Sequence, residues 1–126
     1  MKKLFTFLLF LFFITKSFAQ FDTEHWFAPF ANQNNLETEQ YLYLSTNTST
    51  PFKVEIYNNN ILLQTIQLSK GTPVTIPINS DLMNTDPNDD SDLNKPVKKG
   101  LHLVGEKKFF AHFRFSVPNH AEIITS

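Results

Sequence analysis

The feature that most constrains the fold is a strict alternation of side chains late in the chain. Between residues 109 and 117 every second residue is apolar, namely Phe109, Ala111, Phe113, Phe115 and Val117. The intervening residues are Phe110, His112, Arg114 and Ser116. Because successive side chains of a strand point to opposite faces, this pattern predicts a β-strand with one buried face.

Two earlier segments with the same period flank a turn and predict a hairpin. Residues 52–56 alternate apolar and polar side chains. After Asn58-Asn59-Asn60, residues 61–68 place Leu62, Ile66 and Leu68 on one face, interrupted by Gln64, with Ile61 and Leu63 on the other. Asparagine tolerates the left-handed backbone that a tight hairpin turn requires. The strand after the hairpin, residues 74–78, contains Pro77 and follows Pro73, so we expect it at a sheet edge or at a bulge.

Further short strands complete the expected fold. Residues 41–44 favour a strand, residues 101–104 precede an expected turn at Gly105, and Trp26, Ala28 and Phe30 are expected on one face of a first strand. No segment has helical periodicity with caps. About seven short strands between turns predict an all-β fold, an antiparallel β-sandwich of immunoglobulin-like type. Residues 121–126 resemble the start of another strand, and we therefore expect the domain to be incomplete at its C-terminus.

The segment 81–99 is polar, rich in turn-forming residues and long for a hairpin connection, so we expect an exposed acidic loop. Asp86, Asn88 and Asp90 have the first, third and fifth positions of a calcium-binding loop. Ser91 and Val97 stand where that loop needs glycine and a bidentate glutamate, so it is not an EF-hand. A solvated loop is the simpler interpretation, and the alternative is an irregular calcium site that includes Asp86, Asn88, Asp90 and Asp92.

Residues 1–19 have the three parts of a cleavable signal peptide. Lys2 and Lys3 form a positive start, residues 4–14 are apolar except Thr6, and Ser17 and Ala19 precede the expected cleavage site. The apolar run is shorter than the roughly 20 residues that span a bilayer. We expect export, no transmembrane segment after cleavage, and one mature domain over residues 20–126.

Composition excludes several functional classes. The chain has 11 basic and 12 acidic residues; three of the basic ones lie in residues 1–19, so the mature segment carries a charge of −4 and no basic patch for nucleic acid. It has no cysteine, which excludes disulfides, thiol nucleophiles and thiolate metal sites. No serine lies in a nucleophile elbow, and the three glycines form no phosphate-binding loop. We therefore expect that the chain is not an enzyme and needs no cofactor.

Carboxylates, histidines and aromatic residues are present that could form a functional site, but their spacing does not identify one. Glu24 and Glu55 are one of many carboxylate pairs that could be chosen for glycoside hydrolysis. The four histidines, at positions 25, 102, 112 and 120, lack metal-ligand spacing, and surface histidines are the simpler interpretation. Six aromatic residues could form a platform for sugar rings, although packing in half-buried strands explains them equally well: Trp26, Phe27, Phe30, Tyr41, Tyr43 and Tyr57.

The segment Asp22–Phe30 resembles the start of mature domains in large surface proteins of gliding Bacteroidetes. Residues 41–46, 54–68, 99–103 and 110–126 are also similar to these proteins, and the resemblance covers nearly all of residues 22–126. The region in question is the IgGFc-binding-protein-like N-terminal part of chains that typically end in a type IX secretion sorting domain. The resemblance implies an extracellular β-sandwich with an adhesive or binding role, and it brings no catalytic residues.

These observations predict a non-catalytic N-terminal module of an exported surface protein, engaged in adhesion or ligand binding during gliding or surface attachment. The alternative is a carbohydrate-binding module of a secreted glycoside hydrolase. The expected partner is an extracellular protein or glycan, with further domains of a longer parent chain. The expected location is extracellular or at the cell surface, or periplasmic if the chain ends at Ser126.

Overall fold

The structure is a computed structural model that describes residues 21–31, 39–85, 96–117 and 120–126. The side chains of residues 117 and 120–122 are not described. The expected signal peptide, residues 1–19, lies outside the described residues. So do the candidate calcium ligands Asp86, Asn88, Asp90 and Asp92, and both expectations stay predictions.

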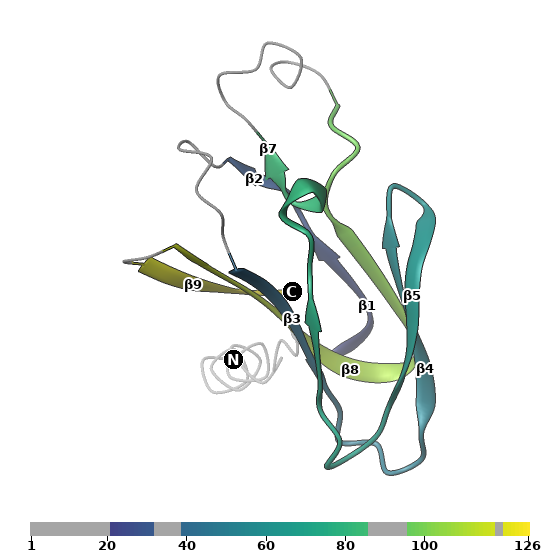
Figure 1. The fold of residues 1–126 in the computed structure, drawn as a ribbon. Helices are drawn as coiled ribbons and strands as arrows, with labels where there is room; N and C mark the ends of the chain where they lie inside the picture. Colours follow the sequence, from purple (N-terminus) through teal and green to yellow (C-terminus); the bar gives the residue numbers. More distant parts are fainter. Residues whose placement is uncertain (1–20, 32–38, 86–95, 118–119) are drawn as a thin grey trace, which may run out of the picture.

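The described part of the chain is built almost entirely from β-strands (Figure 1). Two short strands, β2 (Phe30–Ala31) and β7 (Asn84–Thr85), form a parallel pair, and the 3-10 helix η2 (Ser80–Leu82) leads into β7. The main sheet is antiparallel and contains seven strands, β1 (Asp22–Phe27), β3 (Glu39–Ser45), β4 (Phe52–Asn58), β5 (Ile61–Leu68), β6 (Val74–Pro77), β8 (Leu101–Val117) and β9 (His120–Thr125).

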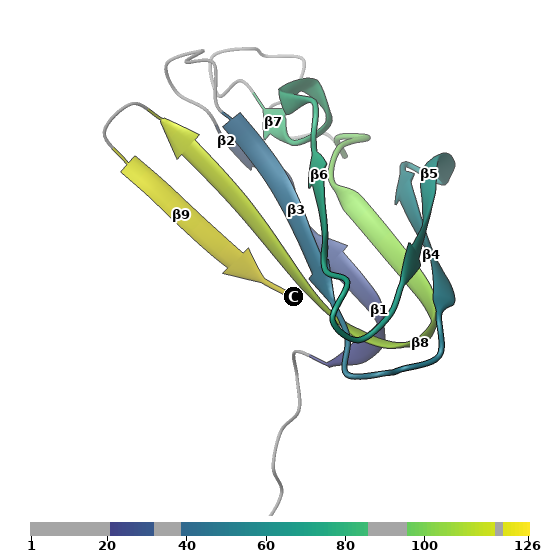
Figure 2. The same cartoon turned by 60° about the horizontal axis from the view of Figure 1, so that its bottom comes forward.

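Strand β8 organises this sheet because it pairs with four other strands. Trp26 of β1 and Tyr57 of β4 both lie opposite His102, so these two strands occupy opposite edges of the first part of β8. Tyr43 of β3 and Thr125 of β9 both lie opposite His112, in the second part. Figure 2 shows β8 curving from one group of strands into the other. We call β5-β4-β8-β1 the first layer and β6-β3-β8-β9 the second layer.

The curve in β8 coincides with an irregularity in its pairing with β1. Asp22 lies opposite Phe109 and Glu24 opposite Val104, so β8 advances five residues while β1 advances two. Extra residues of this kind bend a strand and increase its twist. The expected turn at Gly105 is wrong, because β8 continues through this residue. A side chain at Gly105 would meet the Phe109 ring, with a Cβ-to-ring distance of 2.7 Å, so glycine lets that ring pack over the bend.

The core lies between the two layers and confirms the alternation that predicted it. Phe109, Ala111 and Phe113 are buried, whereas His112 and Arg114 are only half-buried on the other side of β8. The remaining apolar core comes from Met83 and from strands β1, β3, β4, β5, β6 and β8: Phe27, Leu42, Leu44, Phe52, Val54, Ile56, Ile66, Leu68, Ile76, Leu101 and Leu103. The fold class is therefore all-β and sandwich-like; the immunoglobulin-like topology stays a prediction.

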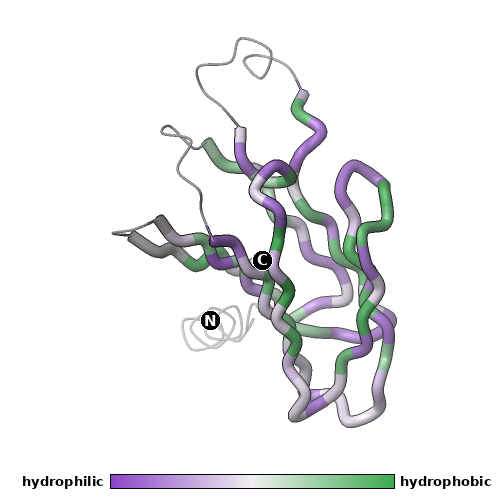
Figure 3. The backbone as a smooth tube through the Cα atoms, viewed as in Figure 1, coloured by the Kyte–Doolittle hydropathy of each residue, from purple (hydrophilic) through white to green (hydrophobic). Residues whose placement is uncertain are grey.

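The hairpin between β4 and β5 has the expected turn. Asn59 and Asn60 have positive φ angles of 46° and 63°, which match the left-handed conformation that this residue type tolerates. Figure 3 shows a hydrophilic hairpin tip followed by a hydrophobic start of β5. The apolar residues there, Ile61, Leu62 and Leu63, are exposed, so the start of β5 contributes little to the core.

Other strands agree with the sequence in part. Among the described strands, β6 pairs only with β3, which confirms the edge position expected as one alternative from its prolines. The expected common face of Trp26, Ala28 and Phe30 is wrong, because β1 ends at Phe27 and buries Phe27 while Trp26 is exposed. Met83, inside the segment expected as an exposed loop, is fully buried next to β7. Among the residues described, we find no helical segment with the length and hydropathy that a bilayer span requires.

Candidate functional site

The outer surface of the first layer carries two rows of side chains that cross three strands. Trp26, His102 and Tyr57 lie opposite one another on β1, β8 and β4. The next row in register contains Glu24, Val104 and Glu55 on the same three strands. We call these six residues the aromatic face. Each points outward because its neighbours along the strand, such as His25, Leu103 and Ile56, point into the core.

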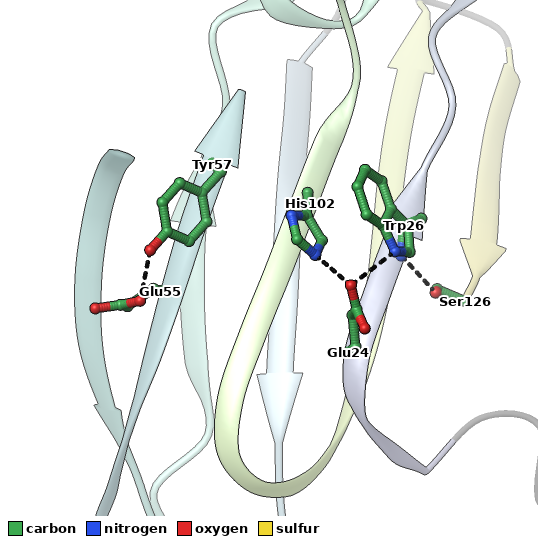
Figure 4. Close-up of polar contacts among 6 residues, drawn as sticks. All are labelled: Glu24, Trp26, Glu55, Tyr57, His102 and Ser126. Atoms are coloured by element: carbon green, nitrogen blue, oxygen red, sulfur yellow. Dashed lines mark hydrogen bonds and ion pairs between the residues drawn. The ribbon is translucent and has the colours of Figure 1, made fainter. Parts of the chain in front are cut away.

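Trp26 and His102 form the central contact of the aromatic face. Their rings stack with centroids 3.6 Å apart and planes 10° from parallel. The Glu24 carboxylate fixes both rings, because its Oε1 atom lies 2.7 Å from His102 Nε2 and accepts a hydrogen bond of 3.2 Å from Trp26 Nε1 (Figure 4). Trp26 is nevertheless 63% exposed. One face of the indole is covered by His102, so the opposite face and the ring edge provide most of this exposed surface.

Tyr57 is held in a similar way on the other side of His102. Its hydroxyl donates a hydrogen bond of 2.5 Å to Oε2 of Glu55 (Figure 4), and its ring centroid lies 5.9 Å from that of His102. The hydrogen bond to Glu55, then partial burial and the negative charge of Glu55, raise the pKa of Tyr57 above its ordinary value of 10.0. Tyr57 therefore stays a neutral phenol across the physiological range and offers an uncharged ring surface.

Two open depressions adjoin the aromatic face, and Asn60 and His102 line both. The larger, of about 370 Å³, lies between Trp26 and the segment Val97–Leu101. The smaller, of about 280 Å³, is lined by Glu55, Tyr57, Asn60, His102 and Val104. The surface is therefore hollowed on both sides of His102. A ligand lying along Trp26, His102 and Tyr57 would contact rings, carboxylates and a side-chain amide.

The structure divides the six aromatic residues that the sequence offered as one platform. Trp26 and Tyr57 lie on the aromatic face. Phe27 is buried, and Phe30 packs on Phe115 with ring centroids 4.4 Å apart. Tyr41 and Tyr43 lie on the outer surface of the second layer, because they alternate with the buried Leu42 and Leu44. Only two of the six residues can therefore contact one ligand on the first layer.

The histidines also differ from one another. His25 is 1% exposed, and its Nε2 bonds the backbone oxygen of Phe109, so the surface interpretation is wrong for this residue. His102 belongs to the aromatic face, His112 is half-buried on the second layer, and the side chain of His120 is not described. Within the described ranges, no group of three or more histidine, aspartate or glutamate side chains is placed to hold a metal ion.

Two features of this site could not be read from the sequence. Glu24 and Glu55 appeared as an arbitrary pair, yet the register places both in one row with Val104 between them. His102 carried no motif, and its stacking on Trp26 depends on the pairing of β1 with β8, which are far apart in the chain. The one signal in the sequence was that His102 lies between two leucines, Leu101 and Leu103, so that in a strand its side chain points to the opposite, outer face.

Comparison of the chain with protein-family models, with curated proteins and with solved structures finds no match.

Proposed function

We propose that this chain is an exported, non-catalytic binding module that contacts its ligand through the aromatic face. The observation that carries the proposal is that the Trp26 side chain is both exposed and held in place. A large indole that is 63% exposed, yet fixed by a ring stack and a hydrogen bond, keeps apolar surface ready for a partner without a further loss of side-chain freedom. Exposed aromatic residues of this kind are typical anchors of binding sites.

The surroundings of the two carboxylates favour binding over catalysis. Glu24 and Glu55 each use an oxygen to hold a ring of the neighbouring row. Both lie on an open sheet surface, where water reaches any reacting group, whereas catalytic sites commonly exclude water. In this proposal their role is to position the rings and to accept hydrogen bonds from a ligand.

The cellular setting of the proposal comes from the sequence. The signal-peptide pattern of residues 1–19 supports export. The resemblance of residues 22–126 to surface proteins of gliding Bacteroidetes supports a place at the cell surface and a role in adhesion. In this setting the partner is an extracellular protein or glycan.

The test uses the full chain, expressed in a bacterial host with a C-terminal affinity tag. Export predicts a mature protein that begins at Gln20, which mass spectrometry detects. The mature protein is then added to bacterial cells, and the fraction retained on the pelleted cells is measured. We expect Trp26→Ala to reduce retention about tenfold, the loss expected for an aromatic anchor.

Tyr43→Ala is the matched control because it removes an aromatic ring from the outer surface of the second layer. It should leave retention unchanged. Equal retention of the wild type and the Trp26→Ala variant, or equal loss in both variants, would contradict the proposed binding surface. A mature protein that still carries residues 1–19 would contradict export.

A further inference from the structure

The aromatic face combines two kinds of ligand contact at a fixed spacing. Strands β1 and β4 lie on either side of β8, so Trp26 and Tyr57 begin from backbones about 10 Å apart, twice the usual spacing of neighbouring strands. The row of Glu24, Val104 and Glu55 runs parallel to the row of rings. Because the Trp26 and His102 rings are stacked on each other, a ligand lying across the strands would meet their edges, the free face of Trp26 and the Tyr57 ring on one side and the carboxylates on the other.

Each carboxylate has a second oxygen for a ligand. Both contacts of Glu24 end on Oε1, and the contact of Glu55 ends on Oε2. Among the described residues, Glu24 Oε2 and Glu55 Oε1 take no hydrogen bond. The oxygens in use hold Trp26, His102 and Tyr57 in place, so the acceptors and the rings are arranged before a ligand arrives.

This arrangement discriminates between ligand classes. An acidic ligand would be repelled by Glu24 and Glu55. A wholly apolar partner would remove both carboxylates from water without supplying donors, which is costly. A pyranose ring presents an apolar C–H surface on its face and hydroxyl donors around its rim, so one sugar unit satisfies both rows at once.

We infer that the aromatic face binds a neutral polysaccharide whose pyranose rings lie along Trp26, His102 and Tyr57. The inference rests on the proposed function and names the class of its ligand. The spacing of the outer two strands favours a flat, extended β-linked chain, in which one disaccharide unit reaches from Trp26 to Tyr57. A helical α-linked chain turns its rings away from a flat surface and meets only one end of the row.

The experiment uses Trp26 as its own reporter, because it is the single tryptophan of the chain. The mature full-length protein is titrated with hexasaccharides of β-1,4-linked glucose, N-acetylglucosamine, mannose and xylose. The hexasaccharide of α-1,4-linked glucose is the matched control for linkage. We expect at least one β-linked probe to shift the emission of Trp26 to shorter wavelength, with the α-linked probe binding about tenfold more weakly or not at all.

Variants test the two rows separately by calorimetry. Tyr57→Ala removes a stacking surface and should weaken binding of the same probe about tenfold. Glu24→Gln and Glu55→Gln keep the size of the side chain and should each weaken binding several-fold, whereas Tyr43→Ala should have no effect. Equal affinity in the wild type and in all three variants of the face would overturn the inference, as would the absence of binding to every β-linked probe.

A further probe separates this inference from the proposed function. Tetramethylammonium can sit over an aromatic ring beside a carboxylate and contains no hydroxyl group. A Trp26 response to tetramethylammonium without a response to any hexasaccharide would overturn the polysaccharide and leave a binding surface. Retention that does not depend on Trp26 would contradict both the polysaccharide ligand and the proposed binding surface.

Discussion

At the scale of single residues, His25 shows how a polar side chain can serve as a core residue. Its Nε2 faces two carbonyl oxygens, of Phe109 at 2.9 Å and of Asp22 at 3.2 Å, so this nitrogen carries the proton and donates. Its Nδ1 then accepts a hydrogen bond from the hydroxyl of Ser126, whose Oγ lies 3.3 Å away. His25 thereby connects β1 to the bend of β8 and to the residue that follows β9.

Tyr57 gives a prediction about pH at the same scale. Because Glu55 raises the pKa of Tyr57, the folded state holds the phenol proton more tightly than the unfolded state does. The stability that results is fully present below pH 10.0 and is lost as the pH rises through the raised pKa. In a Tyr41→Phe, Tyr43→Phe background, the phenolate absorbance of Tyr57 should reach its midpoint above pH 10.0.

Adding Glu55→Gln to that background removes the charge and weakens the hydrogen bond. The midpoint should then move down towards the ordinary value. Circular dichroism at each pH checks that both proteins stay folded through the titration. An unchanged midpoint would mean that Glu55 does not control the phenol.

At the scale of elements, the bend of β8 depends on Gly105 and Phe109. A Cβ at position 105 would lie 2.7 Å from the Phe109 ring and 2.9 Å from the backbone oxygen of Lys107. Both contacts are too close, and Phe109 is fully buried, so the ring has little room to move. Gly105→Ala should lower the free energy of unfolding by about 1–3 kcal/mol, as overpacking of a core does.

Urea denaturation measures this loss. Val104→Ala is the neighbouring control, because Val104 points outward and its truncation should change stability by about 0.5 kcal/mol or less. If the two variants lost the same stability, the bend would not depend on close packing at position 105.

The elements also show what the sequence could predict. The hairpin of β4 and β5, the edge position of β6 and the buried face of β8 follow from local signals: alternation, asparagines and prolines. The bend does not, because the residues around Gly105 keep their strand propensity and the curvature arises from packing on Phe109. The aromatic face was missed for a related reason, since it depends on the register of β1 and β4 against β8.

At the scale of the whole molecule, apolar side chains are exposed at two edges of the sheet. Strand β5 ends the first layer with Ile61, Leu62 and Leu63 exposed, and in β9 of the second layer Ile123 is 66% exposed. Exposed apolar edge strands favour pairing between molecules. The purified mature chain should therefore self-associate as its concentration rises, which static light scattering detects.

Charged residues at these edges should reduce self-association without unfolding the protein. Leu62→Lys and Ile123→Lys combined should lower the average mass towards that of a monomer, because lysine at an edge opposes strand pairing. Val104→Lys, compared with each single edge substitution, is the control, since it adds one positive charge on the central strand β8. A monodisperse wild-type monomer, or an equal effect of the control, would contradict a role of the edges.

The position of β8 in the chain also determines when the protein can fold during its synthesis. Until β8 has been made, the described strands can form only the β4–β5, β3–β6 and β2–β7 pairs, since β1 and the junction between layers wait for residues 101–117. Pairings between segments so distant in sequence form slowly. In the proposed export by residues 1–19, the late synthesis of β8 would keep the chain in the unfolded state that passage through a narrow translocation channel requires.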